Sequence, residues 1–107
     1  MVARQPYKLI YDNAVINHIL RIDTKHHSLV RDTVYEQLSF EPELESKNRK
    51  PLQLPFEIGA TWELRFGPAN IFRVFYSVNH ASHQVNILAI GIKRRNVLYI
   101  GGEEFKL

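Results

Sequence analysis

A single arginine stands in one of the most apolar runs of the chain, "IFRVFYSV" at residues 71–78. A buried guanidinium is costly unless an anion meets it. Since side chains alternate across a strand, Arg73 is expected on the opposite face from the apolar set Phe72, Val74, Tyr76 and Val78. We therefore expect the apolar set to pack under helices. Arg73 should point to the other, more open face, where a carboxylate or an anionic ligand can meet it.

Further cations follow the apolar run at 84–92. Lys93, Arg94 and Arg95 leave the end of this predicted strand, and Tyr99 comes four residues after Arg95. Arginine binds phosphate bidentately and lysine binds it as a point charge. Around a partly covered sheet face, this set of side chains favours a phosphate-containing ligand.

The sequence offers few groups for proton transfer. Glu63, in "TWELRF" at 61–66, is either a general base or the ion-pair partner of Arg73. The second interpretation is favoured, because opposite charges commonly pair across strands. His80 and His83 fall in a predicted hairpin tip without any obvious further ligand, so no metal site is predicted.

Helical periodicity marks the amino-terminal part of the chain. A strand is predicted at 6–11, followed by a helix that Asp12 caps and that runs to about Asp23. Its expected buried stripe is Val15, Ile16, Ile19 and Leu20. Ser28 is the expected cap of a second helix, which ends before Pro42. Its apolar residues recur every four positions, at Val30, Val34 and Leu38. The short connection predicts an antiparallel helix pair.

Three strand-like runs follow, at 61–66, 71–78 and 84–92, with links short enough for hairpins. Segment 41–59 holds three prolines and the basic cluster 47–50, and is predicted as a loop with a positive tip. The final "IGGEEFKL" is predicted as a short strand or turn that covers the sheet edge. This order indicates an α+β fold, with an N-terminal strand and helical hairpin packed on an antiparallel sheet (β-α-α-β-β-β).

Composition limits the class of protein. With 107 residues, 45% hydrophobic and 23% charged, the chain is expected to fold as one domain over 1–107. It has no cysteine, which excludes disulfides and thiolate zinc sites, and we expect no cofactor. No signal peptide or membrane-spanning apolar run is evident, so a cytoplasmic location is expected. The net charge of +3 permits a phosphate-rich partner.

Three stretches, "WELRFG", "NIFRVFYSV" and "VNILAIGIKRRNVLYIGGEEF", together resemble the carboxyl-terminal half of the RelE/ParE superfamily. These proteins are the toxins of bacterial type II toxin–antitoxin systems. The preceding "RKPL" and the order of one strand, two helices and three strands fit the same pattern. The resemblance covers nearly the whole chain and implies a cognate antitoxin as partner.

The resemblance also implies an activity. Ribonuclease members of the superfamily act in the ribosomal decoding site and cut messenger RNA. By this likeness Arg73 lies near the scissile phosphate and Tyr99 serves the same site. Lys93 supplies a second cation, or Arg94 does if the match shifts by one residue. RNA can be cleaved by its own 2′-hydroxyl without a metal, if a base removes the proton and cations stabilise the developing charge.

Other basic residues are expected to bind the RNA. They are Arg49, Lys50, Arg65, Arg94 and Arg95. Such cations contact the nucleic-acid backbone and raise the association rate. One departure from the ribonuclease pattern is that Thr61 and Glu63 stand where these toxins often carry lysines, which leaves the general base open between Glu63 and other groups.

Two alternatives share the same fold. One is a ParE-like inhibitor that binds DNA gyrase without cutting RNA, and the other is a catalytically weakened, protein-binding member. Fold alone does not separate these functions. The co-occurrence of Arg73, the cluster 93–95 and Tyr99 favours the ribonuclease, because a gyrase inhibitor would not need that set.

Overall fold

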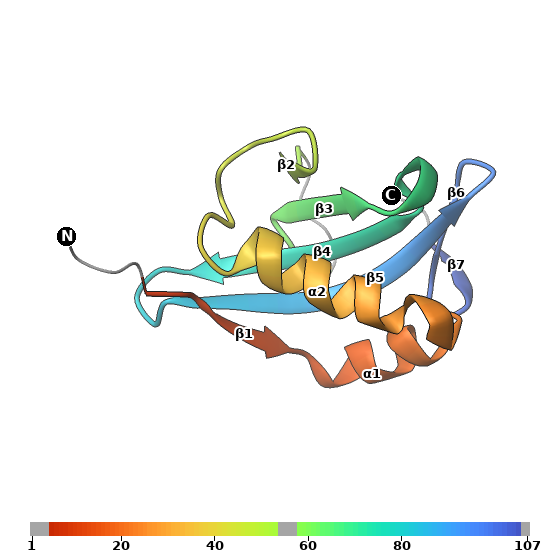
Figure 1. Ribbon diagram of the computed structural model, residues 1–107, viewed down its shortest axis with the longest axis horizontal. Helices are drawn as coiled ribbons and strands as arrows, with labels where there is room; N and C mark the ends of the chain where they lie inside the picture. Colours follow the sequence, from red (N-terminus) through yellow and green to blue (C-terminus); the bar gives the residue numbers. More distant parts are fainter. Residues whose placement is uncertain (1–4, 54–57, 106–107) are drawn as a thin grey trace.

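The computed structural model describes residues 5–53 and 58–105 and has an α+β architecture (Figure 1). Its helices are α1 (Asn13–Leu20) and α2 (His27–Leu38), with a 3₁₀ turn at Thr24–His26 between them. The strands are β1 (Lys8–Tyr11), β2 (Arg49–Pro51), β3 (Trp62–Phe66), β4 (Phe72–Asn79), β5 (Gln84–Arg94), β6 (Val97–Ile100) and β7 (Glu103–Phe105). Both helices lie on the same face of the sheet. Neither is long and apolar enough to span a bilayer, nor is any other helix in the described ranges.

The long strand β5 organises the sheet. The order is β2-β3-β4-β5-β6-β7, and these neighbours are all antiparallel. Strand β1 pairs in parallel with the first half of β5, where Tyr11 is opposite Ile87. Strand β6 pairs with the second half, where Arg94 is opposite Val97. The predicted order of one strand, two helices and three strands is confirmed, and two short strands continue it beyond β5.

Two loop predictions had different outcomes. The tail prediction is confirmed, because Glu103–Phe105 pairs with β6 as strand β7. The prediction of a wholly irregular segment 41–59 is wrong at Arg49–Pro51, which pairs with β3 as strand β2. Hydrogen bonds to an adjacent strand can override weak local propensity. Part of this segment, 54–57, lies outside the described residues.

The main core lies between the helices and the sheet, as predicted. Val30, Val34 and Leu38 of α2 are buried against the predicted apolar set of β4. The stripe of α1 is only half correct. Val15 is buried and Ile19 packs against the core, but the side chains of Ile16 and Leu20 are 63% and 70% exposed. Helix α1 has only eight residues, or about two turns, and it packs mainly against β5. The sheet therefore covers only one narrow side of this helix.

The helix caps show where local prediction works. The Asp12 carboxylate accepts a hydrogen bond from the Ala14 N–H at 3.0 Å, which confirms it as a cap. Helix α1 ends at Leu20, before Asp23, which instead caps the 3₁₀ turn. The prediction of Ser28 as a cap is wrong. The 3₁₀ turn runs directly into α2: the His26 N–H donates to the carbonyl of Asp23, and the His27 N–H donates to the carbonyl of Thr24.

Tyr76 anchors the segment after α2 to the sheet. Its buried hydroxyl donates to the carbonyl of Pro42, with 2.5 Å between the oxygens, and burial raises the pKa of the phenol. We expect Tyr76→Phe to lower the free energy of unfolding by about 1–2 kcal/mol, because a buried carbonyl loses its donor. Urea unfolding measures the change. Tyr35→Phe on the exposed side of α2 is the control, and equal stability of both variants would contradict the anchor.

Candidate functional site

Arg73 lies on the sheet face opposite the helices, as predicted, but that face is not open. Only 9% of the residue is exposed. A second apolar cluster, built on Phe75, Ala89 and Leu98, lies on this side of the sheet, and Phe105 of β7 packs against it. The expectation of an open face is therefore wrong, since the chain segments around the sheet supply their own apolar cover.

Glu63 holds two arginines on this face. Its carboxylate accepts from Nε of Arg65 at 2.5 Å and from Nη1 of Arg73 at 3.5 Å, and it is 3% exposed. Arg65 and Arg73 are directly opposite each other in the β3–β4 register. Their positive charges repel each other unless an anion lies between them. The interpretation of Glu63 as the partner of Arg73 is confirmed, while a base role for Glu63 stays a prediction.

The Arg73 guanidinium is fixed on two sides. Its Nε donates to the carbonyl of Asn70 at 2.9 Å, and its Nη1 faces Glu63. Burial lowers the pKa of Arg73, and the Glu63 carboxylate opposes that shift. An arginine remains protonated despite such effects. Its other N–H groups can therefore serve as donors that are already oriented.

Arg73 and Lys93 share a cavity of about 380 Å³, which we call the Arg73 cavity. Gly91 is opposite Arg73 in the β4–β5 register, so Lys93, two residues further, is on the same face. Glu63 and Asn96 also line the cavity, and Leu98 and Phe105 form apolar walls. The cavity therefore combines two cations with two acidic residues, Glu63, which is already paired with Arg65 and Arg73, and Glu104.

Tyr99 and Arg94 are on the other face of the sheet. Tyr99 is opposite Ile92, which packs into the main core, whereas its neighbour Leu98 belongs to the cluster beside Arg73. Alternation along β6 therefore separates Tyr99 from Arg73. With Arg94 and Arg95, Tyr99 lines a cavity of about 550 Å³, which we call the Tyr99 cavity. Six of the nine predicted site residues are thus divided between the two cavities, three in each.

Two residues of the Tyr99 cavity were missed in the sequence, His18 and Arg21. His18 is in the last turn of α1 and Arg21 follows that helix. Their spacing of three residues puts both on one side of the helix end, which is a weak signal by itself. Only the packing of α1 against β5 brings them to Arg94 and Tyr99.

The remaining predicted RNA-binding residues differ in what they contact. The Arg49 side chain is hydrogen-bonded within the protein. It donates to the Gln37 carbonyl at the end of α2 at 3.1 Å and to the Leu44 carbonyl in the following loop at 2.8 Å. Lys50 is opposite Glu63 in the β2–β3 register, beside Arg65 on the face of the Arg73 cavity. Lys50 also approaches Glu45 at 3.8 Å.

The histidines of the predicted hairpin tip contact separate neighbours. His80 lies 2.5 Å from a Glu43 carboxylate oxygen, and the ring of His83 stacks on Tyr7 at 3.8 Å. Within residues 5–53 and 58–105, no group of three or more His, Cys, Asp or Glu side chains is placed to hold a metal ion.

Comparison with solved structures identifies the fold. One match is a chain in the crystal structure of the toxin–antitoxin complex RelBE2 from Mycobacterium tuberculosis, with a TM-score of 0.67. The sequences are 21% identical, and the alignment covers 85% of this chain and 95% of the other. No protein-family model and no curated protein matches the sequence. The chain therefore has a RelE-like toxin fold, as the sequence predicted.

Proposed function

We propose that this chain is the toxin of a toxin–antitoxin pair and that it cleaves messenger RNA on translating ribosomes. The observation that carries the proposal is the Arg73 cavity, where a guanidinium fixed by Glu63 and Asn70 shares a concave site with Lys93. The shared fold with a chain of a toxin–antitoxin complex supports an antitoxin as partner. Such a protein acts in the cytoplasm, where ribosomes and messenger RNA are its other partners.

The proposed reaction needs cations, a proton acceptor and a proton donor. The 2′-hydroxyl gives its proton to a base and its oxygen attacks the adjacent phosphorus. The bond from phosphorus to the 5′-oxygen breaks and that oxygen takes up a proton, giving a 2′,3′-cyclic phosphate and a 5′-hydroxyl end. Arg73 and Lys93 stabilise the charge that develops on the phosphate oxygens. Glu63 positions Arg73 through its ion pair. Lys50 and Arg65, on the same face, contact the RNA backbone on either side of the cut.

Induction in a bacterial host tests this proposal. We expect new messenger RNA 5′ ends inside translated regions within minutes, mapped by primer extension, and we expect them to disappear when translation initiation is blocked beforehand. The ends should carry 5′-hydroxyls and so accept an adaptor only after treatment with a polynucleotide kinase.

Two other outcomes would reject the ribonuclease. Growth arrest with intact messages and altered plasmid supercoiling would indicate a gyrase inhibitor. The absence of any arrest, with soluble folded protein present, would indicate a protein-binding member of the fold that has lost activity.

A further inference from the structure

We propose that the Tyr99 cavity is a second binding site for single-stranded RNA, on the face of the sheet opposite the Arg73 cavity. The end of α1, the β5–β6 hairpin and the Gly101–Gly102 turn form its walls. Its volume of about 550 Å³ lies within the range of small-ligand sites in proteins. The site holds one nucleotide of a strand whose remainder lies along the surface.

The charge of this cavity favours an anion. Arg21, Arg94 and Arg95 line it, and no carboxylate of the described part of the chain does. Among residues 5–53 and 58–105, none forms an ion pair with these three arginines, whereas Arg65 and Arg73 share Glu63. Unpaired guanidiniums gathered around one concavity repel one another until a ligand neutralises them. A phosphate accepts two N–H groups from a single guanidinium.

The aromatic and apolar parts of the cavity favour a nucleotide over a simple anion. Tyr99 is 36% exposed, and Ile22 and Ile92 line the cavity beside it. Stacking of bases on an aromatic ring next to cations is the usual way in which proteins hold single strands. An acidic side chain of a protein partner would satisfy the arginines but would leave the ring without a planar neighbour.

His18 adds a fixed polar group. The backbone N–H of Ile90 donates to Nδ1 of His18 at 3.3 Å, so the neutral ring carries its proton on Nε2. Burial lowers the pKa of His18, and Asp12 only partly opposes this shift. His18 therefore offers an N–H donor near neutral pH. A methyl group on Gly101 would lie 3.3 Å from the His18 ring, which shows how closely the turn approaches the ring.

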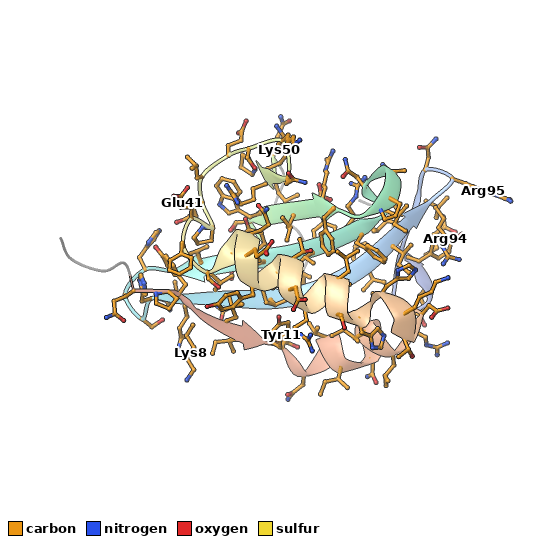
Figure 2. All side chains as sticks on the ribbon, viewed as in Figure 1. Lys8, Tyr11, Glu41, Lys50, Arg94 and Arg95 are labelled. Carbon is orange, nitrogen blue, oxygen red and sulfur yellow. The ribbon has the colours of Figure 1, made fainter. Side chains whose placement is uncertain are left out.

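The Tyr99 cavity and the Arg73 cavity lie on opposite faces of the sheet, near the β5–β6 hairpin. Figure 2 shows Arg94 and Arg95 by the β5–β6 hairpin, and Lys8 near the opposite end of the molecule. Arg94 and Lys93 are neighbours in sequence but line different cavities. A strand that passes around the edge of the sheet can therefore contact both faces, with one nucleotide held at Tyr99 and another at Arg73.

Binding to an RNA that cannot be cleaved tests this site separately from the proposed nuclease. The probe is a fluorescein-labelled 12-nucleotide RNA with 2′-O-methyl groups, and fluorescence anisotropy of the full chain measures Kd. We expect the Arg21→Gln, Arg94→Gln double variant to weaken binding at least tenfold. The slope of log K against log salt should fall in magnitude by about 1.4, as expected for two lost contacts to a single strand.

Matched variants separate the contributions of charge and ring. The Lys8→Gln, Arg31→Gln double variant loses the same charge at exposed positions outside the cavity, and should change Kd less than threefold. Tyr99→Phe keeps the ring and should weaken binding less than Tyr99→Ala does. Tyr99→Ala should weaken binding about tenfold, within the range of base-stacking losses. Circular dichroism checks that each variant is folded.

Three results would overturn the proposal. The first is that the Lys8→Gln, Arg31→Gln variant weakens RNA binding as much as the Arg21→Gln, Arg94→Gln variant does. That result would mean that RNA is attracted by the net charge of the protein and not by this cavity. The second is weakening by Arg73→Gln and Lys93→Gln but not by the Tyr99-cavity variants, which would assign all binding to the other face. The third is displacement of the RNA by a 12-residue poly-glutamate at equal concentration, which would indicate an acidic protein partner. Failure of the cleavage assay leaves each of these results interpretable, because no cleavage or ribosome is involved.

Discussion

Glu63→Gln should lower the free energy of unfolding by about 3 kcal/mol, the lower end of what loss of one partner costs a buried ion pair. The variant keeps the shape of the side chain but removes the carboxylate that lies within 3.5 Å of both Arg65 and Arg73. These two arginines are directly opposite each other, and the Arg73 side chain is only 10% exposed. Arg65 can turn toward water, but Arg73 cannot.

Urea unfolding of Glu63→Gln beside Glu45→Gln measures this effect. Glu45 contacts Lys50 at 3.8 Å in a solvent-exposed pair, so its loss should cost at most about 0.5 kcal/mol. A second variant, Glu63→Gln with Arg73→Met, removes both partners and should recover much of the lost stability. If Glu63→Gln unfolds with the free energy of the parent chain, the ion pairs contribute nothing and Glu63 is free to act as a base.

Arg73→Ala should reduce RNA cleavage on the order of 10², which is the usual loss when one donor to a developing charge is removed. The fold should survive this change, because Glu63 keeps Arg65 as a partner and the repulsion between the two arginines is relieved. Loss of the packed arginine stem should cost about 1 kcal/mol. Arg73→Ala is therefore expected to be milder for stability than Glu63→Gln and far more harmful for activity.

Quantitative primer extension after induction gives the cleavage rate of Arg73→Ala relative to the parent chain. Arg31→Ala is the control, since Arg31 is exposed on α2 and its ion pair within residues 5–53 and 58–105 is with the equally exposed Asp32. Unchanged cleavage in Arg73→Ala would exclude Arg73 from the site. Loss of a cooperative unfolding transition would show that its role is structural instead.

Alternating and helical patterns determined most of the fold. Phe72, Val74 and Tyr76 alternate with Arg73 along β4, and this alternation predicted which face lies under the helices. The pairing register, which shifts between Phe75 and Tyr76 against β5, was decided only by the structure. The stripe of α2 was equally clear, because twelve residues allow several turns to meet the sheet. The buried stripe of α1 was predicted less well. Periodicity shows which residues share a side of a helix, but it does not show how much of that side the sheet covers.

The sequence by itself therefore indicated the RelE-like order of elements and the cationic region that follows β5, and it favoured Glu63 as the partner of Arg73. Tertiary structure alone decided which cations line the same cavity. Lys93 and Arg94 are adjacent, yet the pleat of β5 sends one to Arg73 and the other to Tyr99. His18 of α1 and Arg21, which follows that helix, line the second cavity with Arg94, from which they are more than seventy residues away along the chain. Contacts across such distances depend on how helix and sheet pack, and local sequence patterns do not record that packing.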